Sequence, residues 1–125
     1  MIILYAEDDP EDVEVFCEAV RSIDASIGCI IARDGLEALK ILENAVILPD
    51  FIFLDINMPL VDGRECLIRI RGNRQFNNIP VIMYTTSNRK DDMSGLRNLG
   101  ATDYIIKPNT FNEVFRHLSK VLKAS

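Results

Sequence analysis

Five short apolar segments, separated by stretches with helical periodicity, most strongly constrain the fold of this chain. They span residues 2–6, 28–32, 51–54, 79–84 and 103–106. Runs of this length bounded by turn formers predict buried strands, whereas apolar residues that recur every three or four positions predict amphipathic helices. Strands that alternate with helices over short loops need right-handed crossovers, which produce a parallel sheet covered on both faces. We therefore predict a doubly wound α/β fold with five parallel strands and five helices.

The predicted helices have recognisable starts. Asp9 suits the N-cap before Pro10, because aspartate accepts hydrogen bonds from free backbone N–H groups and proline is tolerated in the first helical turn. Gly95 lies inside the fourth helix, which predicts low local stability there. The first helix is expected to run from residue 10 to about 22. The second begins at Asp34-Gly35, with Leu36, Leu39 and Leu42 facing inward. The other three are expected over residues 63–71, 91–99 and 111–122.

Length and charge limit what kind of protein this is. A chain of 125 residues has the usual size of one domain, so we expect residues 1–125 to form a single domain with no output domain. A net charge of -5 and a pI near 4.8 disfavour binding to nucleic acid or to an anionic membrane. The arginines that come closest to a basic cluster alternate with apolar helix positions, and we interpret them as a solvated helix face: Arg64, Arg69, Arg71 and Arg74.

The three cysteines, Cys17, Cys29 and Cys66, are odd in number, far apart in the sequence and embedded in apolar patterns. They have no zinc-site spacing and are typical of reduced core thiols. The amino terminus is too short and too soon acidic for a signal peptide, and no apolar run approaches the length of a membrane span. We therefore predict a cytoplasmic protein.

Polar residues follow four of the five predicted strands. Glu7 and Asp8 follow the first, Asp55 the third, Thr85 the fourth and Lys107 the fifth. The carboxyl ends of parallel strands meet at one edge of the sheet, where ligands bind in open α/β folds. Asp55 alone could be a turn residue, and Lys107 alone a salt-bridge partner. Their coincidence at one edge instead predicts a shared cleft.

The chemistry of these groups points to phosphoryl transfer. Three clustered carboxylates repel one another and need a cation, and oxygen ligands select a hard ion such as Mg²⁺. The backbone carbonyl of Asn57 could supply a neutral ligand. With Lys107 and Thr85 to hold phosphoryl oxygens, Asp55 would be the nucleophile. Because the sequence has no glycine-rich phosphate loop, the phosphoryl group must arrive on another carrier.

These residues resemble those of the receiver domain of two-component response regulators, over essentially the whole chain. The resemblance implies a flavodoxin-like fold with strand order 2-1-3-4-5, of the stand-alone, single-domain type. It rests on the acidic pair Glu7-Asp8, Asp55 with Met58-Pro59 and Asp62-Gly63 behind it, Thr85 after Ile79-Pro80-Val81-Ile82, and Gly100-Ala101 leading through Tyr104 to Lys107-Pro108.

The resemblance also implies roles for individual residues. Asp55 would accept a phosphoryl group from a sensor histidine kinase and lose it slowly, without turnover as an enzyme. Asp8 would bind Mg²⁺ directly and Glu7 would assist through water. Lys107 and Thr85 would contact the phosphoryl group. The Lys107-Pro108 peptide bond is expected to be cis, an isomer that proline permits.

A switch follows from the charge that phosphorylation adds. The new oxygens would draw the Thr85 hydroxyl inward, and Tyr104 would fill the space that it leaves. The affected surface would be the fourth helix, fifth strand and fifth helix, which would bind a downstream protein or a phosphorelay protein. Tyr104 could also be an ordinary strand aromatic. A homodimer through the last helix is compatible with the sequence.

Some residues differ from the usual receiver sequence or have no role in it. Thr86 stands where the family usually has a small residue, and its bulk is expected to affect the lifetime of the acyl phosphate together with Asn57 and Ser87. The run Thr85-Thr86-Ser87 and residues 74–78 resemble small receivers, some of which serve phytochrome-type kinases. His117 lies beside the apolar stripe of the last helix, and we interpret it as a partly exposed helical histidine.

Two other functions remain open at this point. One is a phosphatase or phosphotransferase with an aspartyl phosphate intermediate, but such enzymes generally carry a second acid two positions after the nucleophile. Asn57 occupies that position here. The other is a binding module of receiver shape that never uses its phosphate site. Continuous hydrolysis of small phosphate esters would distinguish the enzyme from a receiver domain. Stoichiometric phosphorylation would distinguish a receiver domain from the binding module.

Overall fold

Five parallel strands form the centre of the computed structural model, which describes residues 1–123. Their order in the sheet is β2-β1-β3-β4-β5, so the predicted doubly wound topology is confirmed. Strand β3 is central and all four of its residues are buried. The strands are β1 (Ile2–Ala6), β2 (Gly28–Ala32), β3 (Phe51–Leu54), β4 (Val81–Thr85) and β5 (Asp103–Ile106).

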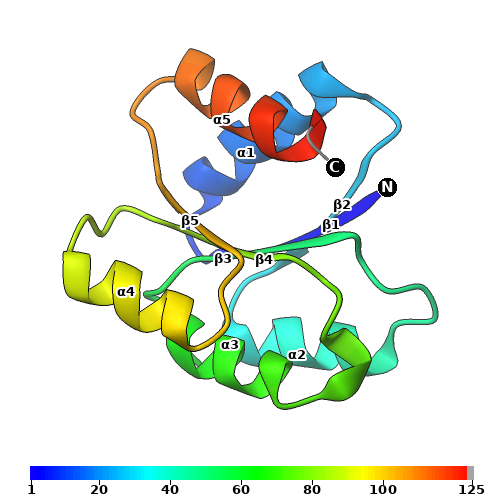
Figure 1. Ribbon diagram of the computed structural model, residues 1–125. Helices are drawn as coiled ribbons and strands as arrows, with labels where there is room; N and C mark the ends of the chain where they lie inside the picture. Colours follow the sequence, from blue (N-terminus) through cyan, green and yellow to red (C-terminus); the bar gives the residue numbers. More distant parts are fainter. Residues whose placement is uncertain (124–125) are drawn as a thin grey trace.

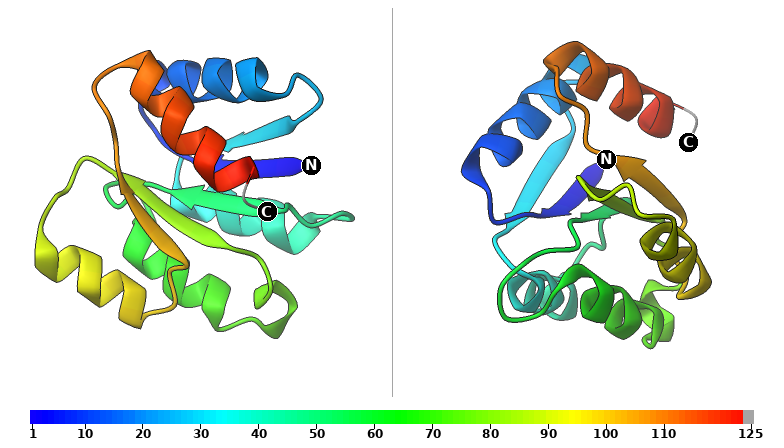
Figure 2. Two further views of the ribbon diagram at one scale, coloured as in Figure 1. Left: turned by 45° about the horizontal axis from the view of Figure 1, so that its top comes forward. Right: turned by 90° about the vertical axis from the view of Figure 1, so that its left-hand side faces the viewer.

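Helices cover both faces of this sheet. In Figure 1, α1 (Pro10–Ile23) and α5 (Phe111–Lys123) lie above it. Below it lie α2 (Gly35–Asn44), α3 (Gly63–Arg71) and α4 (Lys90–Asn98), and Figure 2 shows the same layers from two further sides. A short 3-10 helix, Arg74–Phe76, follows α3. Within residues 1–123, every helix is too short or too polar to cross a lipid bilayer.

The predicted element bounds agree with the structure to within two residues. The largest shift is at β4, which begins at Val81 rather than Ile79. Pro80 lacks an N–H group and cannot donate to the ladder, although its carbonyl accepts a hydrogen bond from the N–H of Ile52 at 3.0 Å. Proline therefore sets the start of this strand.

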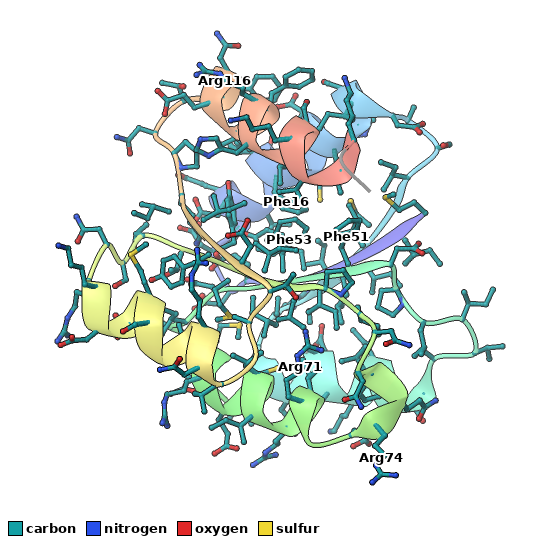
Figure 3. All side chains as sticks on the ribbon, viewed as in Figure 1. Phe16, Phe51, Phe53, Arg71, Arg74 and Arg116 are labelled. Carbon is teal, nitrogen blue, oxygen red and sulfur yellow. The ribbon has the colours of Figure 1, made fainter. Side chains whose placement is uncertain are left out.

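An aromatic cluster fills the layer between the sheet and helices α1 and α5. Tyr5, Phe53 and Tyr84 come from three adjacent strands and Phe16 comes from α1. The Phe16 ring lies 4.1 Å from Tyr5 and 5.1 Å from Phe53, centroid to centroid, and Phe16 and Phe53 are labelled in this layer in Figure 3. Aromatic packing of this kind buries a large apolar area and holds α1 in place on β1.

Aspartates cap three of the helices at the carboxyl edge of the sheet. The Asp9 side chain accepts a hydrogen bond from Glu11 N at 2.9 Å, which confirms the predicted N-cap of α1. Asp34 and Asp62 cap α2 and α3 in the same way. These caps place the amino-terminal ends of three helices next to the loops that follow β1, β2 and β3.

Arg71 does not belong to a solvated helix face, so that interpretation was wrong for this residue. Its guanidinium donates hydrogen bonds to the carbonyl oxygens of Gly100, Phe76 and Ile79 at 2.9, 3.2 and 3.0 Å. Partial burial lowers the pKa of Arg71. A planar group with five donors can join two connections at once, here α3–β4 and α4–β5, which helical periodicity alone cannot reveal. In Figure 3, Arg71 lies between α3 and the sheet.

Candidate functional site

Three carboxylates meet at the carboxyl edge of the sheet. Glu7 and Asp8 directly follow β1, and Asp55 directly follows the neighbouring strand β3. One oxygen from each lies within 4.8 Å of the others. Glu7 and Asp55 are buried, with 2% and 7% of their surface exposed, whereas Asp8 is exposed. The fold thus brings together the acids that the sequence placed after separate strands.

Glu7 has the most buried carboxylate of the three. It accepts hydrogen bonds from the Tyr5 hydroxyl at 3.2 Å, from the backbone N–H of Asp8 at 3.1 Å and of Asp9 at 3.2 Å, and from the Lys107 ammonium. Burial raises the pKa of Glu7, and the hydrogen bond from Lys107 opposes that rise. A buried carboxylate with this many donors has little freedom to move.

Lys107 places one ammonium among several carboxylates. Its Nζ contacts Glu7, donates to Asp12 Oδ2 at 2.9 Å and lies 3.7 Å from Asp55 Oδ2. Only 8% of the Lys107 side chain is exposed. Burial by itself would lower the pKa of Lys107, but the hydrogen bonds to Glu7 and Asp12 and the charge of Asp55 raise it above its usual range. Lys107 is therefore cationic and aimed at the acids.

The backbone of Lys107 is held by β4. Its N–H donates to the carbonyl oxygen of Thr85 at 2.7 Å. The Lys107-Pro108 peptide bond is trans, so the expectation of a cis bond was wrong. The trans isomer is the intrinsically favoured one for a bond before proline, and in it the side chain already reaches Glu7 and Asp12.

The loop after β3 is fixed at several points. Asp55 Oδ1 accepts a hydrogen bond from the N–H of Ile56 at 2.9 Å. Gly63 donates to the carbonyl of Ile56 at 2.8 Å, and Gly35 donates to the carbonyl of Val61 at 3.1 Å. Both glycines approach the loop so closely that a Cβ would lie 2.0 Å from the Asp55 carbonyl oxygen or 2.1 Å from that of Val61. Glycine is required at these positions for space.

Two exposed residues occupy the outer part of this loop. Asn57, whose carbonyl was predicted as a ligand, lies two residues beyond Asp55 and is exposed. Leu60 is 78% exposed and has φ = 65°, and the N–H of Val61 donates to the carbonyl of Pro59 across it at 2.8 Å. A positive φ is uncommon for leucine, and the close contacts at Gly35 and Gly63 hold the loop in this turn.

Thr85 and Tyr104 both contact Ser87, which lies in the loop between β4 and α4. Thr85 is fully buried, and its hydroxyl accepts a hydrogen bond from Ser87 N at 3.5 Å. The Tyr104 hydroxyl donates to the Ser87 carbonyl at 2.9 Å, and only 7% of Tyr104 is exposed. Burial raises the pKa of Tyr104. The structure thus already has Tyr104 in a buried position, and Ser87 links both side chains.

Asp12 and Tyr5 are site residues that sequence reasoning missed. Asp12 lies in the first turn of α1, where an acid favours the helix dipole, yet it also pairs with Lys107. Its place in the first turn of the helix that follows Glu7 and Asp8 was the available signal. Tyr5 had no signal, since a tyrosine within an apolar strand normally indicates packing alone.

Thr86 and His117 are two further residues that the sequence singled out. Thr86, directly after Thr85, is exposed. His117 is half-buried on α5, as predicted, but its Nδ1 atom is buried and makes no hydrogen bond within residues 1–123. Neither residue contacts the acids through an interaction that the structure describes.

The donor set of this cluster fits a hard divalent cation. All three side chains offer carboxylate oxygens, the ligands that Mg²⁺ and Mn²⁺ prefer. Two unit charges 4.8 Å apart repel by about 3.5 kcal/mol at an effective dielectric near 20. Lys107 offsets only part of the charge, because it faces Asp12 as well. A bound cation would relieve the remaining repulsion.

Comparisons with known proteins identify the family. The family model described as the response regulator receiver domain matches residues 3–119. The response regulator Rcp1 of Synechocystis sp. is 34% identical over 92% of this chain and 82% of its own length. The crystal structure of the Mn²⁺-bound form of Rcp1 matches with a TM-score of 0.86 at 31% identity, over 96% of this chain and 90% of that one.

A second solved structure is similar over an even larger share of the chain. The phosphorylated cyanobacterial phytochrome response regulator RcpA matches with a TM-score of 0.91 at 29% identity, over 98% of this chain and 91% of that one. Fold, strand order and the acidic cluster agree with this family. The chain therefore belongs to the receiver domains of two-component response regulators.

Proposed function

We propose that this chain is the phosphoacceptor of a two-component phosphorelay, with Asp55 as the residue that takes the phosphoryl group. The observation that carries this proposal is the position of Asp55, which lies with two further carboxylates within 4.8 Å and with the Lys107 ammonium at 3.7 Å. Receiver domains are phosphorylated by histidine kinases, so the donor would be a phosphohistidine. Signalling would then depend on a contact with a partner protein.

The acidic cluster would hold Mg²⁺. Asp8 and Asp55 would be direct ligands, the backbone carbonyl of Asn57 would be a third, and Glu7 would act through water. Support comes from the all-oxygen donor set and from the Mn²⁺-bound form of the similar protein Rcp1. When bound, the cation neutralises carboxylate charge and polarises the phosphoryl oxygens.

The chain's own residues would carry out the transfer. An oxygen of Asp55 attacks the phosphorus atom of a phosphohistidine whose other ring nitrogen carries a proton. The P–N bond breaks, and the imidazole takes the electron pair and leaves as the neutral base. The Lys107 ammonium lies 3.7 Å from Asp55 Oδ2. It would bind a phosphoryl oxygen at a shorter distance than that. The Thr85 hydroxyl binds another phosphoryl oxygen and gives up the hydrogen bond that it accepts from Ser87 N. Both contacts strengthen as the phosphoryl group moves from the histidine to Asp55, and they therefore stabilise the transition state.

The phosphorylated form would lose its phosphoryl group slowly. Asn57 stands two residues after Asp55, where an acid would otherwise activate water, so turnover as an enzyme is not expected. Thr86 is exposed beside Thr85 and would shield the acyl phosphate from water. Replacing Thr86 with alanine is therefore a direct way to change the phosphoryl lifetime.

The switch would involve Thr85, Ser87 and Tyr104. Withdrawal of the Thr85 hydroxyl toward the phosphoryl group would favour the buried position of Tyr104, where its hydroxyl donates to Ser87. Because Tyr104 belongs to β5, the change would reach the surface formed by α4, β5 and α5. A preference of a few kcal/mol between two conformations suffices to alter partner binding.

The finer identity of the partners is also part of the proposal. A phytochrome-type sensor kinase is favoured, because the similar protein RcpA is a cyanobacterial phytochrome response regulator. The downstream partner would be a protein or a phosphorelay protein rather than nucleic acid. The single receiver domain without an output domain, the cytoplasmic location and a homodimer through α5 stay predictions.

The test is phosphorylation by a small phosphodonor. Incubation with acetyl phosphate and Mg²⁺ is expected to add one phosphoryl group per chain. Among the described carboxylates of the cluster, Asp55 lies near the Lys107 ammonium without being hydrogen-bonded to it, whereas Glu7 is held by that ammonium. Chelation of divalent ions is expected to prevent the addition, since the donor and the acids would repel one another. Intact mass spectrometry after rapid acid quenching measures both results.

Two outcomes would contradict this proposal. The absence of any phosphoryl adduct at saturating acetyl phosphate and Mg²⁺ would favour a binding module that does not use the site. Continuous release of inorganic phosphate from p-nitrophenyl phosphate, without accumulation of the adduct, would favour a phosphatase.

Asp12 is expected to position Lys107 for this reaction. Asp12→Ala removes a 2.9 Å hydrogen bond to the ammonium and should slow phosphorylation by acetyl phosphate about fivefold. That factor corresponds to about 1 kcal/mol, the value of a charge-assisted hydrogen bond discounted for an Asp12 side chain that is 39% exposed. The rate of adduct formation under excess phosphodonor measures the effect.

A double-mutant cycle separates this role from a general effect on the fold. In a Lys107→Ala background, Asp12→Ala should have no further effect on the rate, because the ammonium that it positions is gone. Glu11→Ala is the matched control, since Glu11 is exposed in the same helical turn. Equal slowing by Asp12→Ala in both backgrounds would show that Asp12 does not act through Lys107.

A further inference from the structure

The Tyr5 hydroxyl reaches the acidic cluster from inside the core. Tyr5 lies on β1, and Glu7, two residues later, continues the ladder of this strand, because its N–H donates to the carbonyl of Ala32 at 2.9 Å. Residues two apart in a strand face the same side of the sheet. The Tyr5 side chain therefore lies beneath Glu7 and donates a hydrogen bond to its Oε1 atom at 3.2 Å.

Packing explains the ring of Tyr5 but not its hydroxyl. The ring is fully buried and lies 4.1 Å from Phe16 and 5.9 Å from Tyr84, centroid to centroid. Phenylalanine would fill the same space, and a buried hydroxyl is costly unless it is hydrogen-bonded. Within residues 1–123, the bond to Glu7 is the one that the structure gives this hydroxyl. Burial and the charge of Glu7 raise the pKa of Tyr5, so the hydroxyl keeps the proton that it donates.

The hydrogen bonds of Glu7 are divided between its two oxygens. Oε2 accepts from the backbone N–H groups of Asp8 and Asp9 at 3.1 and 3.2 Å. Oε1 accepts from the Tyr5 hydroxyl and from the Lys107 ammonium. The backbone donors are fixed, whereas Lys107 is the donor that the proposed phosphoryl transfer draws toward Asp55, 3.7 Å away. Once Lys107 has moved, Tyr5 is the described donor that still holds Oε1.

We propose that Tyr5 is a positioning residue for phosphoryl transfer, which holds Glu7 Oε1 in place when Lys107 leaves it for the phosphoryl group. This role rests on the proposed function and names a further residue that serves it. Tyr5 acts through Glu7 and touches no reacting atom. With its hydroxyl present, Glu7 Oε1 keeps a donor before and after the transfer. Without it, release of Lys107 would leave a buried carboxylate oxygen with no donor, so Lys107 would be retained on Glu7.

The test compares Tyr5→Phe with the unmodified chain in two titrations. Mn²⁺ alone, followed by the electron paramagnetic resonance of the free ion, reports on the site while Lys107 is still on Glu7. Beryllofluoride, a phosphoryl mimic, added with saturating Mg²⁺ and followed by calorimetry, reports on the site after Lys107 has moved. Tyr5→Phe should weaken beryllofluoride binding about tenfold, the effect of losing one hydrogen bond to a buried charge.

Mn²⁺ binding to Tyr5→Phe should weaken less than about twofold, because in that state Lys107 and two backbone N–H groups still hold Glu7. This difference between the two titrations identifies the role, since a general loss of packing would weaken both to the same extent. Tyr84→Phe is the matched control. Tyr84 is buried in the same aromatic layer, its hydroxyl makes no hydrogen bond within residues 1–123, and the substitution keeps its ring. This variant should bind both probes like the unmodified chain.

A Glu7→Gln background tests whether Tyr5 acts through Glu7. There Tyr5→Phe should change beryllofluoride binding less than about twofold, because the neutral side chain no longer holds Lys107 as an ion pair. A tenfold effect that persists in this background would contradict the proposal.

Two further results would overturn the role of Tyr5 while leaving the proposed function intact. One is equal beryllofluoride affinity of Tyr5→Phe and the unmodified chain, and the other is equal weakening of both titrations. If the unmodified chain binds Mn²⁺ but takes up no beryllofluoride, the proposed function itself fails, and the positioning role fails with it.

Discussion

Replacing Asp55 with asparagine is expected to abolish covalent phosphorylation of this protein. The amide is a poor nucleophile, and no other described carboxylate lies both at the tip of β3 and 3.7 Å from the Lys107 ammonium. The nearest alternative acids, Glu7 and Asp8, come from the end of β1. Glu7 is also held by Lys107 and two backbone N–H groups, so its oxygens are not free to attack.

The fold should survive this substitution. Asparagine has nearly the same shape, and it removes one of three mutually repelling charges. Intact mass spectrometry after incubation with acetyl phosphate and Mg²⁺ should show no adduct, and the thermal unfolding midpoint should not fall. Asp91→Asn is the control, because it makes the same chemical change at an exposed position on α4, away from the acidic cluster. An adduct of normal yield on the Asp55→Asn protein would place the phosphoacceptor elsewhere.

Replacing Gly63 with alanine is expected to lower the free energy of unfolding by about 3 kcal/mol. The added Cβ would lie 2.0 Å from the carbonyl oxygen of Asp55 and 2.8 Å from the Cα of Ile56. Because both atoms belong to the backbone, no side-chain rotation can relieve the contact. Either α3 or the loop after β3 must move, and the hydrogen bond from Gly63 to Ile56 would be strained. Urea denaturation monitored by circular dichroism measures the loss.

The same substitution should also slow phosphorylation, because the displaced backbone carries Asp55. Gly95→Ala is the matched control with an effect of opposite sign. Nothing lies within 4 Å of a Cβ at Gly95, which is in the interior of α4, so alanine should stabilise the protein by about 0.5–1 kcal/mol. Equal stability of the Gly63→Ala and unmodified proteins would mean that the loop after β3 adapts without cost.

The strand and helix pattern was readable because each element depends mainly on local chemistry. Apolar runs such as residues 51–54 and caps such as Asp9 and Asp34 act within a few positions of themselves. The grouping of Glu7, Asp8, Asp55 and Lys107 was also predictable, since parallel strands end at one edge.

Side-chain partners could not be predicted in the same way. Arg71 had the spacing of a solvated helix residue and instead joins the α3–β4 and α4–β5 connections. Asp12 lies in the first turn of α1, where an acid favours the helix dipole, and that position does not reveal its pairing with Lys107. The trans bond before Pro108 depends on a backbone conformation that the sequence leaves free.

The sequence by itself determined the alternation of strands and helices, their caps, and the edge of the sheet where acids and a lysine would gather. Those features follow from hydrophobic periodicity and from the direction of parallel strands. Only the tertiary structure decided that Lys107 is shared with Asp12 and that the Arg71 guanidinium reaches the carbonyl oxygens of Gly100 and Phe76. The physical reason is that hydrogen bonds between distant residues require distances of a few ångströms, which packing sets and sequence spacing does not.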